Sequence, residues 1–154
     1  MIVVSDTSAI TSLLQIGRVD LLPSLYSGVI IPEAVARELK RNHPILPDFI
    51  KTVMVVNTSN VAKFSGELDL GEAEAIALMI EGKGDLLLMD ERAGRRLARR
   101  EGVPLIGLLG VLTEAKQRGL ITSLRNELDQ LETVAGFRLS AELKRRVLQT
   151  AGES

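Results

Sequence analysis

The chain has no cysteine and only one histidine, His43, among its 154 residues. The absence of cysteine excludes disulfides, thiolate metal sites and cysteine nucleophiles. A single histidine is too few for a histidine metal cluster, and a Ser/His/Asp triad would depend on that one residue. With one tyrosine, three phenylalanines and no tryptophan, the chain also has too few rings for a base-stacking platform.

Long apolar runs and a charge excess are missing as well. The longest apolar stretch, 103–112, contains Pro104 and is too short to span a bilayer. The 19 basic and 20 acidic residues give a net charge of −1, so bulk basicity does not indicate a nucleic-acid partner. The apolar start ends at Ser5 without a basic region or a cleavage pattern typical of a targeting segment. We expect a cytoplasmic protein that does not bind membranes.

The order of short apolar runs and helical patterns predicts the fold class. Runs without polar alternation are typical of parallel strands covered on both faces, and they lie at 2–5, 29–31, 52–56, 86–89 and, more weakly, 103–106. Helical patterns fill the intervals at 9–16, 32–41, 71–81 and 91–101, and continue at 108–117, 122–134 and 140–149. This alternation predicts an α/β three-layer sandwich, with a parallel sheet of about five strands and a helical C-terminal part. We expect one domain over 1–150 and a frayed C-terminus at 151–154.

Two aspartates stand at the ends of apolar strands, each directly before a helix. In a parallel sheet, Asp6 and Asp90 would both lie at the carboxyl edge, where ligand sites form. Each can equally be an ordinary helix N-cap. Neighbouring oxygen donors that can share either role are Ser5, Thr7, Ser8 and Glu91.

Two glutamates fall on the apolar side of their predicted helices. At 100° per residue, Glu38 lies on the arc that contains Leu39, and Glu72 lies beside Ile76. Glu74 falls on the polar face instead. Glu38 and Glu72 also have structural interpretations, because Glu38 can pair with an arginine and Glu72 can face the positive end of the helix dipole.

If these four carboxylates converge without a cation, they repel one another and their pKa values rise. One or two hard divalent ions would resolve the repulsion, and Mg²⁺ and Mn²⁺ prefer oxygen ligands. Two such ions can activate water and stabilise the leaving oxygen in phosphodiester cleavage. That chemistry requires neither cysteine nor histidine, so it fits this composition.

A basic stripe follows the last of these acids. The arginines of the helix at 91–101 occupy one continuous side of its projection: Arg92, Arg95, Arg96, Arg99 and Arg100. Guanidinium groups form planar, bidentate contacts with phosphate, so the stripe predicts binding along a nucleic-acid backbone. The alternative is a solvated helix face paired with acids on neighbouring elements.

Taken together, these segments resemble the PIN-domain family, a metal-dependent ribonuclease fold found in many toxin components of toxin–antitoxin pairs. The resemblance extends from residue 1 to about 120, and its matching segments are 3–8, 31–39, 70–76, 87–93 and 107–112. It is strongest to a compact subgroup described as nucleic-acid-binding proteins.

The resemblance implies catalytic, metal-binding roles for an acidic quartet: Asp6, Glu38, Glu72 and Asp90. Thr7 or Ser8 matches the hydroxyl beside the first acid. The third position holds Glu72 where many relatives carry aspartate, so Glu74 is an alternative there, as Glu91 is for the fourth acid. The implied cofactor is Mg²⁺ or Mn²⁺, the implied reaction is endonucleolytic RNA cleavage, and the implied partners are a second copy of the chain and a small antitoxin protein.

Three functional hypotheses therefore stand. The first is a divalent-metal ribonuclease in which the arginines at 92–100 guide the RNA strand. The second is a non-catalytic PIN-like module that binds nucleic acid or protein. The third is a phosphatase with Asp6 as nucleophile, which is the weakest because Ser8 stands where such enzymes carry a second aspartate.

Overall fold

A computed structural model describes residues 1–153 of the chain. Its sheet contains five strands in the order β3-β2-β1-β4-β5, and every neighbouring pair is parallel. The strands are β1 (Ile2–Ser5), β2 (Gly28–Pro32), β3 (Ile50–Val53), β4 (Leu86–Leu88) and β5 (Leu105–Ile106). The predicted parallel α/β sandwich is therefore confirmed.

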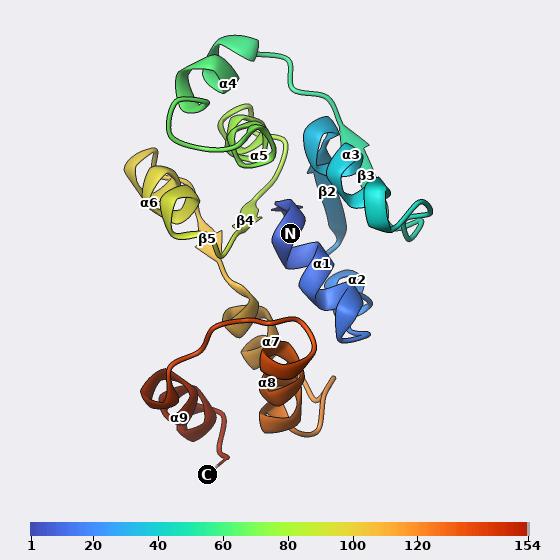
Figure 1. Cartoon of the computed structure of the whole chain (residues 1–154), viewed down its shortest axis with the longest axis vertical. Coiled ribbons are helices and arrows are strands. Elements are labelled where there is room, and N and C mark those ends of the chain that lie inside the picture. Colours follow the sequence, from blue (N-terminus) through green and yellow to red (C-terminus); the bar gives the residue numbers. More distant parts are fainter. Residues whose placement is uncertain (154) are drawn as a thin grey trace.

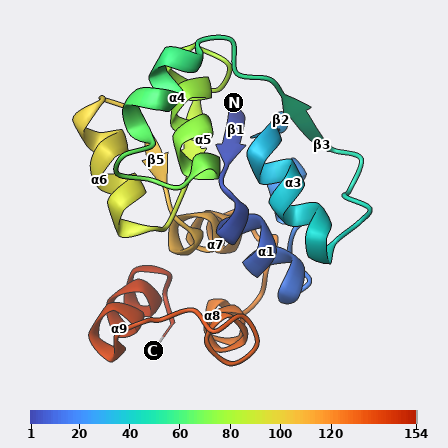
Figure 2. The same ribbon diagram turned by 45° about the horizontal axis from the view of Figure 1, so that its top comes forward.

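Helices cover both faces of this sheet (Figures 1 and 2). One face packs against α1 (Thr7–Gln15), α2 (Leu21–Leu25), α3 (Glu33–Asn42) and α7 (Leu108–Gln117). The other face packs against α4 (Thr58–Phe64), α5 (Leu70–Ile80) and α6 (Arg92–Arg100). Beyond α7, the helices α8 (Leu124–Thr133) and α9 (Ala141–Thr150) extend the first layer.

Alternating strand residues supply the two cores. On β1, Val3 joins the core with α1 and α7, whereas Val4 joins the core with α5 and α6. Successive side chains of a strand point to opposite faces, so both residues can be fully buried. This double burial explains why the strands have apolar runs without polar alternation.

The structure differs from the predicted elements at three places. Helices α2 and α4 were not predicted, because α2 has only 5 residues and α4 buries only Phe64. The run expected at 52–56 lies largely beyond its strand, since β3 ends at Val53. Met54 and Val56, which suggested a strand by their apolarity, are 65% and 75% exposed.

The C-terminal end is held by hydrogen bonds in the part that the structure describes. The fraying that we expected at 151–154 stays a prediction. The Glu153 carboxylate accepts hydrogen bonds from the backbone N–H groups of Leu124 and Arg125, and it pairs with Lys116 at 3.1 Å. These contacts attach the end of α9 to the start of α8. Ser154 lies outside the described residues, and within them no helix is long and apolar enough to cross a membrane.

Candidate active site

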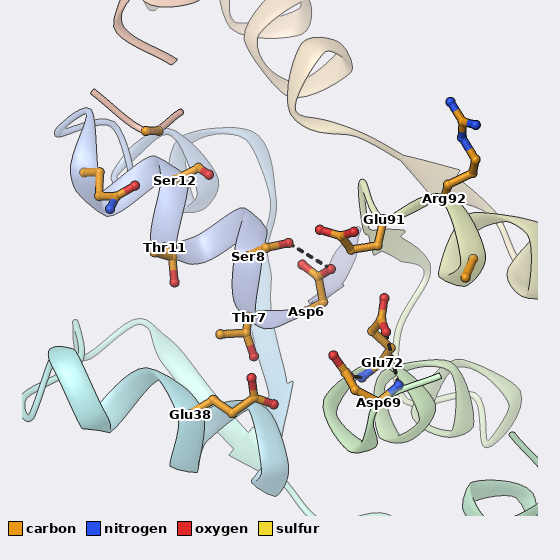
Figure 3. Close-up of a pocket in the computed structure, with 13 residues that line it drawn as sticks. Asp6, Thr7, Ser8, Thr11, Ser12, Glu38, Asp69, Glu72, Glu91 and Arg92 are labelled. Atoms are coloured by element: carbon orange, nitrogen blue, oxygen red, sulfur yellow. Dashed lines mark hydrogen bonds between the residues drawn. The ribbon is translucent and has the colours of Figure 1, made fainter. Parts of the chain in front are cut away.

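The predicted acids lie at the edge of the sheet where the strand order reverses. From β1, the next strands of the chain, β2 and β3, are added toward one edge of the sheet, whereas β4 and β5 are added toward the other edge. The connections therefore leave β1 and β4 in opposite directions, which makes a crevice at the carboxyl ends of these two strands. Asp6 directly follows β1, and its N–H donates to the carbonyl of Leu88, the last residue of β4, at 3.3 Å. A cavity of about 630 Å³ opens here, between α1 and α3 on one side and α5 and α6 on the other (Figure 3).

Asp6 is the most deeply buried acid of the cavity, with 2% of its surface exposed. It is the N-cap of α1, because one carboxyl oxygen accepts from the N–H of Ala9 at 3.1 Å. The other oxygen accepts from the Ser8 hydroxyl at 3.3 Å. Burial nevertheless raises the pKa of Asp6 to about 7, and the charges of Asp90 and Glu72 add to the increase.

Glu72 points from the first turn of α5 toward the same cavity (Figure 3). It forms a capping box with Asp69: the Asp69 carboxylate accepts from the Glu72 N–H at 2.9 Å, and the Glu72 carboxylate accepts from the Asp69 N–H at 3.2 Å. Burial and the adjacent charge of Asp69 raise the pKa of Glu72 to about 7. The helical projection that placed Glu72 inward is confirmed.

Asp90 lies two residues beyond β4 and stabilises a different helix from the one expected. Glu91, not Asp90, is the N-cap of α6. The Asp90 carboxylate instead accepts from the N–H of Leu108, the first residue of α7, at 3.1 Å. Burial raises the pKa of Asp90, although the Leu108 N–H and the positive charge of Arg95 oppose the increase.

Glycines lie directly against three of the predicted acids. A Cβ atom added at Gly71 would lie 2.8 Å from Glu38 Oε1, and one at Gly107 would lie 2.7 Å from Asp90 Oδ1. At Gly94, an added Cβ would clash with the Met89 sulfur and lie 3.2 Å from Glu72 Oε2. Because the backbone comes this close, glycine at each position leaves space for the carboxyl group beside it.

Glu74 lies away from the cavity and has a structural contact. Its carboxylate accepts from the N–H of Ala34 at 2.9 Å, in the first turn of α3. Glu91 lines the cavity, whereas Glu74 does not. The geometry therefore favours Glu72 over Glu74 as the third acid of the cluster.

Similarity to known proteins agrees with this arrangement of fold and acids. A family model described as a PIN domain matches residues 2–153. The chain belongs to the PIN-domain family. PIN domains are generally nucleases, so membership places this chain among proteins with nuclease-type activity. A search of the curated proteins finds no match to the chain.

The predicted arginine stripe of this PIN domain divides into two groups. Arg95 is partly buried and donates to the carbonyl of Met89 at 2.8 Å, and Arg100 pairs with Glu67 at 3.3 Å. The other three arginines are exposed, and their side chains have no hydrogen-bond or ion-pair partner among residues 1–153: Arg92, Arg96 and Arg99. Of the five, Arg92 lines the cavity (Figure 3).

Several residues that line the PIN-domain cavity were missed in the sequence. Asp69 could have been identified from its spacing to Glu72, because an N-cap acid followed three positions later by glutamate is the capping-box pattern. The polar face of α1 contributes Thr11 and Ser12, which no local motif distinguishes. Ala135 comes from the segment that joins α8 to α9, and only the tertiary fold brings that segment to the site.

The donor set of the PIN domain suits a hard divalent ion. Its side chains offer carboxylate and hydroxyl oxygens, and burial has raised the pKa of three of the carboxyl groups. Within residues 1–153, no three aspartate, glutamate or histidine side chains are close enough together to hold one ion by themselves. Mg²⁺ is usually held by one or two carboxylates together with water molecules, so this spacing is compatible with such a site.

The Thr7 hydroxyl is a further unpaired oxygen at this site. It lies on the α3 side of Asp6 (Figure 3), and its oxygen is buried without a hydrogen-bond partner. A buried hydroxyl without a partner loses the hydrogen bonds that water would provide. Thr7 is thus an oxygen donor available to a group bound in the cavity.

Proposed function

We propose that this protein is a divalent-metal-dependent endoribonuclease that hydrolyses RNA phosphodiester bonds. The observation that carries the proposal is the buried Asp6 carboxyl group at the strand crossover, with its pKa raised to about 7 and two further acids close enough to contribute. A buried acidic group in a cleft, perturbed by burial and by specific neighbours, is a good candidate for a functional residue. Membership in a family of nucleases supports the same assignment.

One or two divalent ions, Mg²⁺ or Mn²⁺, would each be held by one or two of the acids at this edge together with water molecules, and these acids are Asp6, Glu38, Glu72 and Asp90. Such an ion, when bound, activates water and neutralises charge on the phosphate oxygens. Asp6 and Asp90 are oriented by the first turns of α1 and α7, so their carboxyl groups are fixed before any ligand arrives. Ser8 and Thr7 add hydroxyl oxygens beside Asp6, and Glu91 adds a carboxylate at the rim.

The free arginines of α6 would bind the RNA backbone beside these acids. Arg92 lines the cavity, while Arg96 and Arg99 extend the positive surface along the same helix. Their guanidinium groups have no protein partner in the described chain, so they can bind phosphate without first breaking an ion pair. Arg95, by contrast, would act by keeping Asp90 in place.

The proposal is tested by incubating the purified protein with single-stranded RNA in Mn²⁺, in Mg²⁺ and in a chelator. Metal-dependent cleavage is expected for the wild type and for Glu74→Gln, the matched control on the same helix as Glu72. It is expected to be lost in Asp6→Asn and greatly reduced in Glu72→Gln. Undiminished cleavage by Asp6→Asn would exclude Asp6 from the reaction.

A second candidate is a non-catalytic PIN-like module that binds nucleic acid or protein. It is favoured by the spacing of the described acids, no three of which are placed to share one ion. RNA binding without cleavage in either metal would support this module over the nuclease. The phosphatase hypothesis gains no support, because Ser8, at its critical position, donates a hydrogen bond to Asp6 rather than supplying a second acid.

The toxin role, the antitoxin partner and the homodimer rest on the resemblance alone and stay predictions. Light scattering of the purified chain measures the oligomeric state directly. Growth arrest on expression, relieved by co-expression of a small protein that is encoded by the neighbouring gene, would identify a toxin. Growth unaffected by an RNA-cleaving chain would oppose that role.

A further inference from the structure

A second cavity continues the candidate active site on the α1 side. Its volume is about 410 Å³, and it shares wall residues with the first cavity: Ser8, Ser12, Glu91 and Ala135. Its remaining lining comes from the sequence 136–138, between α8 and α9, and from Asp90 and Leu108. The two cavities therefore form one continuous groove that passes the acids.

Arg138 is the cation of this second cavity. The other charged side chains that line it are Asp90 and Glu91, both acidic. Arg138 is exposed and has no hydrogen-bond or ion-pair partner within residues 1–153. Its backbone position is fixed, because the N–H of Phe137 donates to the carbonyl of Leu131 at 2.9 Å and the Phe137 ring packs partly against the core.

We propose that this second cavity is a nucleotide subsite of the RNA groove, in which Arg138 binds a backbone phosphate on the side of the acids opposite α6. The proposal rests on the function proposed above, because it takes RNA as the ligand. An RNA strand is repelled by the carboxylates that line the first cavity. Arg92 on one side and Arg138 on the other would hold it across that acidic region.

The polar face of α1 gives the subsite a means of recognising ribose. The Ser8 hydroxyl is engaged with Asp6, but the Ser12 hydroxyl, one turn further along, has no partner among residues 1–153. It lines both cavities, the first with the acids and the second with Arg138. A free hydroxyl at this place can bind the 2′-OH that distinguishes RNA from DNA.

The test measures binding of a labelled single-stranded uridine oligonucleotide by fluorescence anisotropy, in Ca²⁺ and over a range of salt concentrations. Arg138→Gln is expected to weaken binding about tenfold and to lower the salt slope by about 0.7, the value for one single-strand phosphate contact. Arg138→Lys should keep the salt slope of the wild type. The matched control is Arg145→Gln, an exposed arginine on α9 that lines neither cavity of the groove and should bind as the wild type does.

A cleavage assay with the same RNA in Mn²⁺ distinguishes a failure of the subsite proposal from a failure of the proposed nuclease activity. If Arg138→Gln binds as tightly as the wild type and with the same salt slope, the subsite is wrong, whether or not the wild type cuts RNA. If the wild type does not cut RNA but Arg138→Gln still weakens binding, the nuclease is wrong and the subsite stands. Thermal unfolding checks that both variants are folded, and Ser12→Ala should reduce the preference for RNA over DNA of the same sequence.

Discussion

Replacing Asp6 with asparagine should stabilise the protein at neutral pH while removing the metal-dependent activity that we propose. Asparagine can keep both hydrogen bonds of the cap, because its carbonyl accepts from the Ala9 N–H and its amide donates to the Ser8 hydroxyl. It cannot carry the buried negative charge. The variant thus separates the structural role of Asp6 from its ionisation.

The magnitude follows from the pKa of Asp6, which folding raises from 3.8 to about 7. Between these values the folded chain keeps a proton that the unfolded chain has released. The free energy of unfolding of the wild type therefore falls as the pH rises, by about 1.4 kcal/mol per pH unit. The stability present at low pH is lost progressively up to pH 7. Asp6→Asn does not show this loss, because asparagine has no carboxyl group to titrate.

The assay is thermal unfolding of the wild type and Asp6→Asn at pH 5 and pH 8, without divalent metal. The difference in stability should grow in favour of Asp6→Asn by about 3 kcal/mol between these pH values. For a chain of this length, that corresponds to about 6–12 °C in Tm. Glu72, whose pKa is also raised, remains in both proteins, so the difference reports the ionisation of Asp6 together with its charge interaction with Glu72.

Two results would refute this reasoning. A difference in Tm that does not change with pH would mean that Asp6 has no raised pKa in the folded chain. An Asp6→Asn variant less stable than the wild type at pH 8 would mean that its carboxylate is stabilising there. In a second arm at pH 8, Mn²⁺ should raise the Tm of the wild type by mass action and leave that of Asp6→Asn unchanged.

Three further predictions concern the rest of the site. Glu74→Gln should leave cleavage near the wild-type rate, whereas Glu72→Gln should reduce it strongly in the same assay; the opposite order would overturn the choice of third acid. Gly94→Ala should destabilise the fold by about 1–3 kcal/mol in denaturant unfolding, because its Cβ would meet the Met89 sulfur and approach Glu72; unchanged stability would contradict this close packing. Replacing Arg96 and Arg99 together with glutamine should lower the salt slope of RNA binding by about 1.4, and an unchanged slope would reduce that stretch of α6 to a solvated face.

The sequence predicts most of the fold because its strongest signals are local. Doubly buried strands need continuous apolar runs, and β1, β2 and β4 have them. The prediction fails where local pattern and tertiary burial diverge. Met54 and Val56 are apolar but exposed, and α4 forms from residues with little helical character because Phe64 is buried against α5.

The candidate site is predictable to a similar extent. Glu72 is identifiable because an acid on the apolar arc of a helix is conspicuous, and Asp6 because it ends a buried strand. The role of Asp90 was not predictable, since its partner Leu108 is 18 residues away and belongs to another helix. Arg138 could not be found either, because the segment that carries it reaches the site only through the packing of α8 and α9.

Each acid of this site has an ordinary structural role, and those roles alone do not account for the arrangement. Asp6 caps α1, Glu72 completes a capping box with Asp69, and Asp90 holds the start of α7. A cap functions equally well at an exposed helix end, where its charge is solvated. Here all three are placed in one crevice, where burial raises each pKa and the charges of Glu72 and Asp90 raise that of Asp6 further. This convergence destabilises the chain at neutral pH, and a bound divalent cation would reverse the effect. The convergence of the acids, more than the presence of any one of them, is therefore what supports the metal-dependent site that we propose.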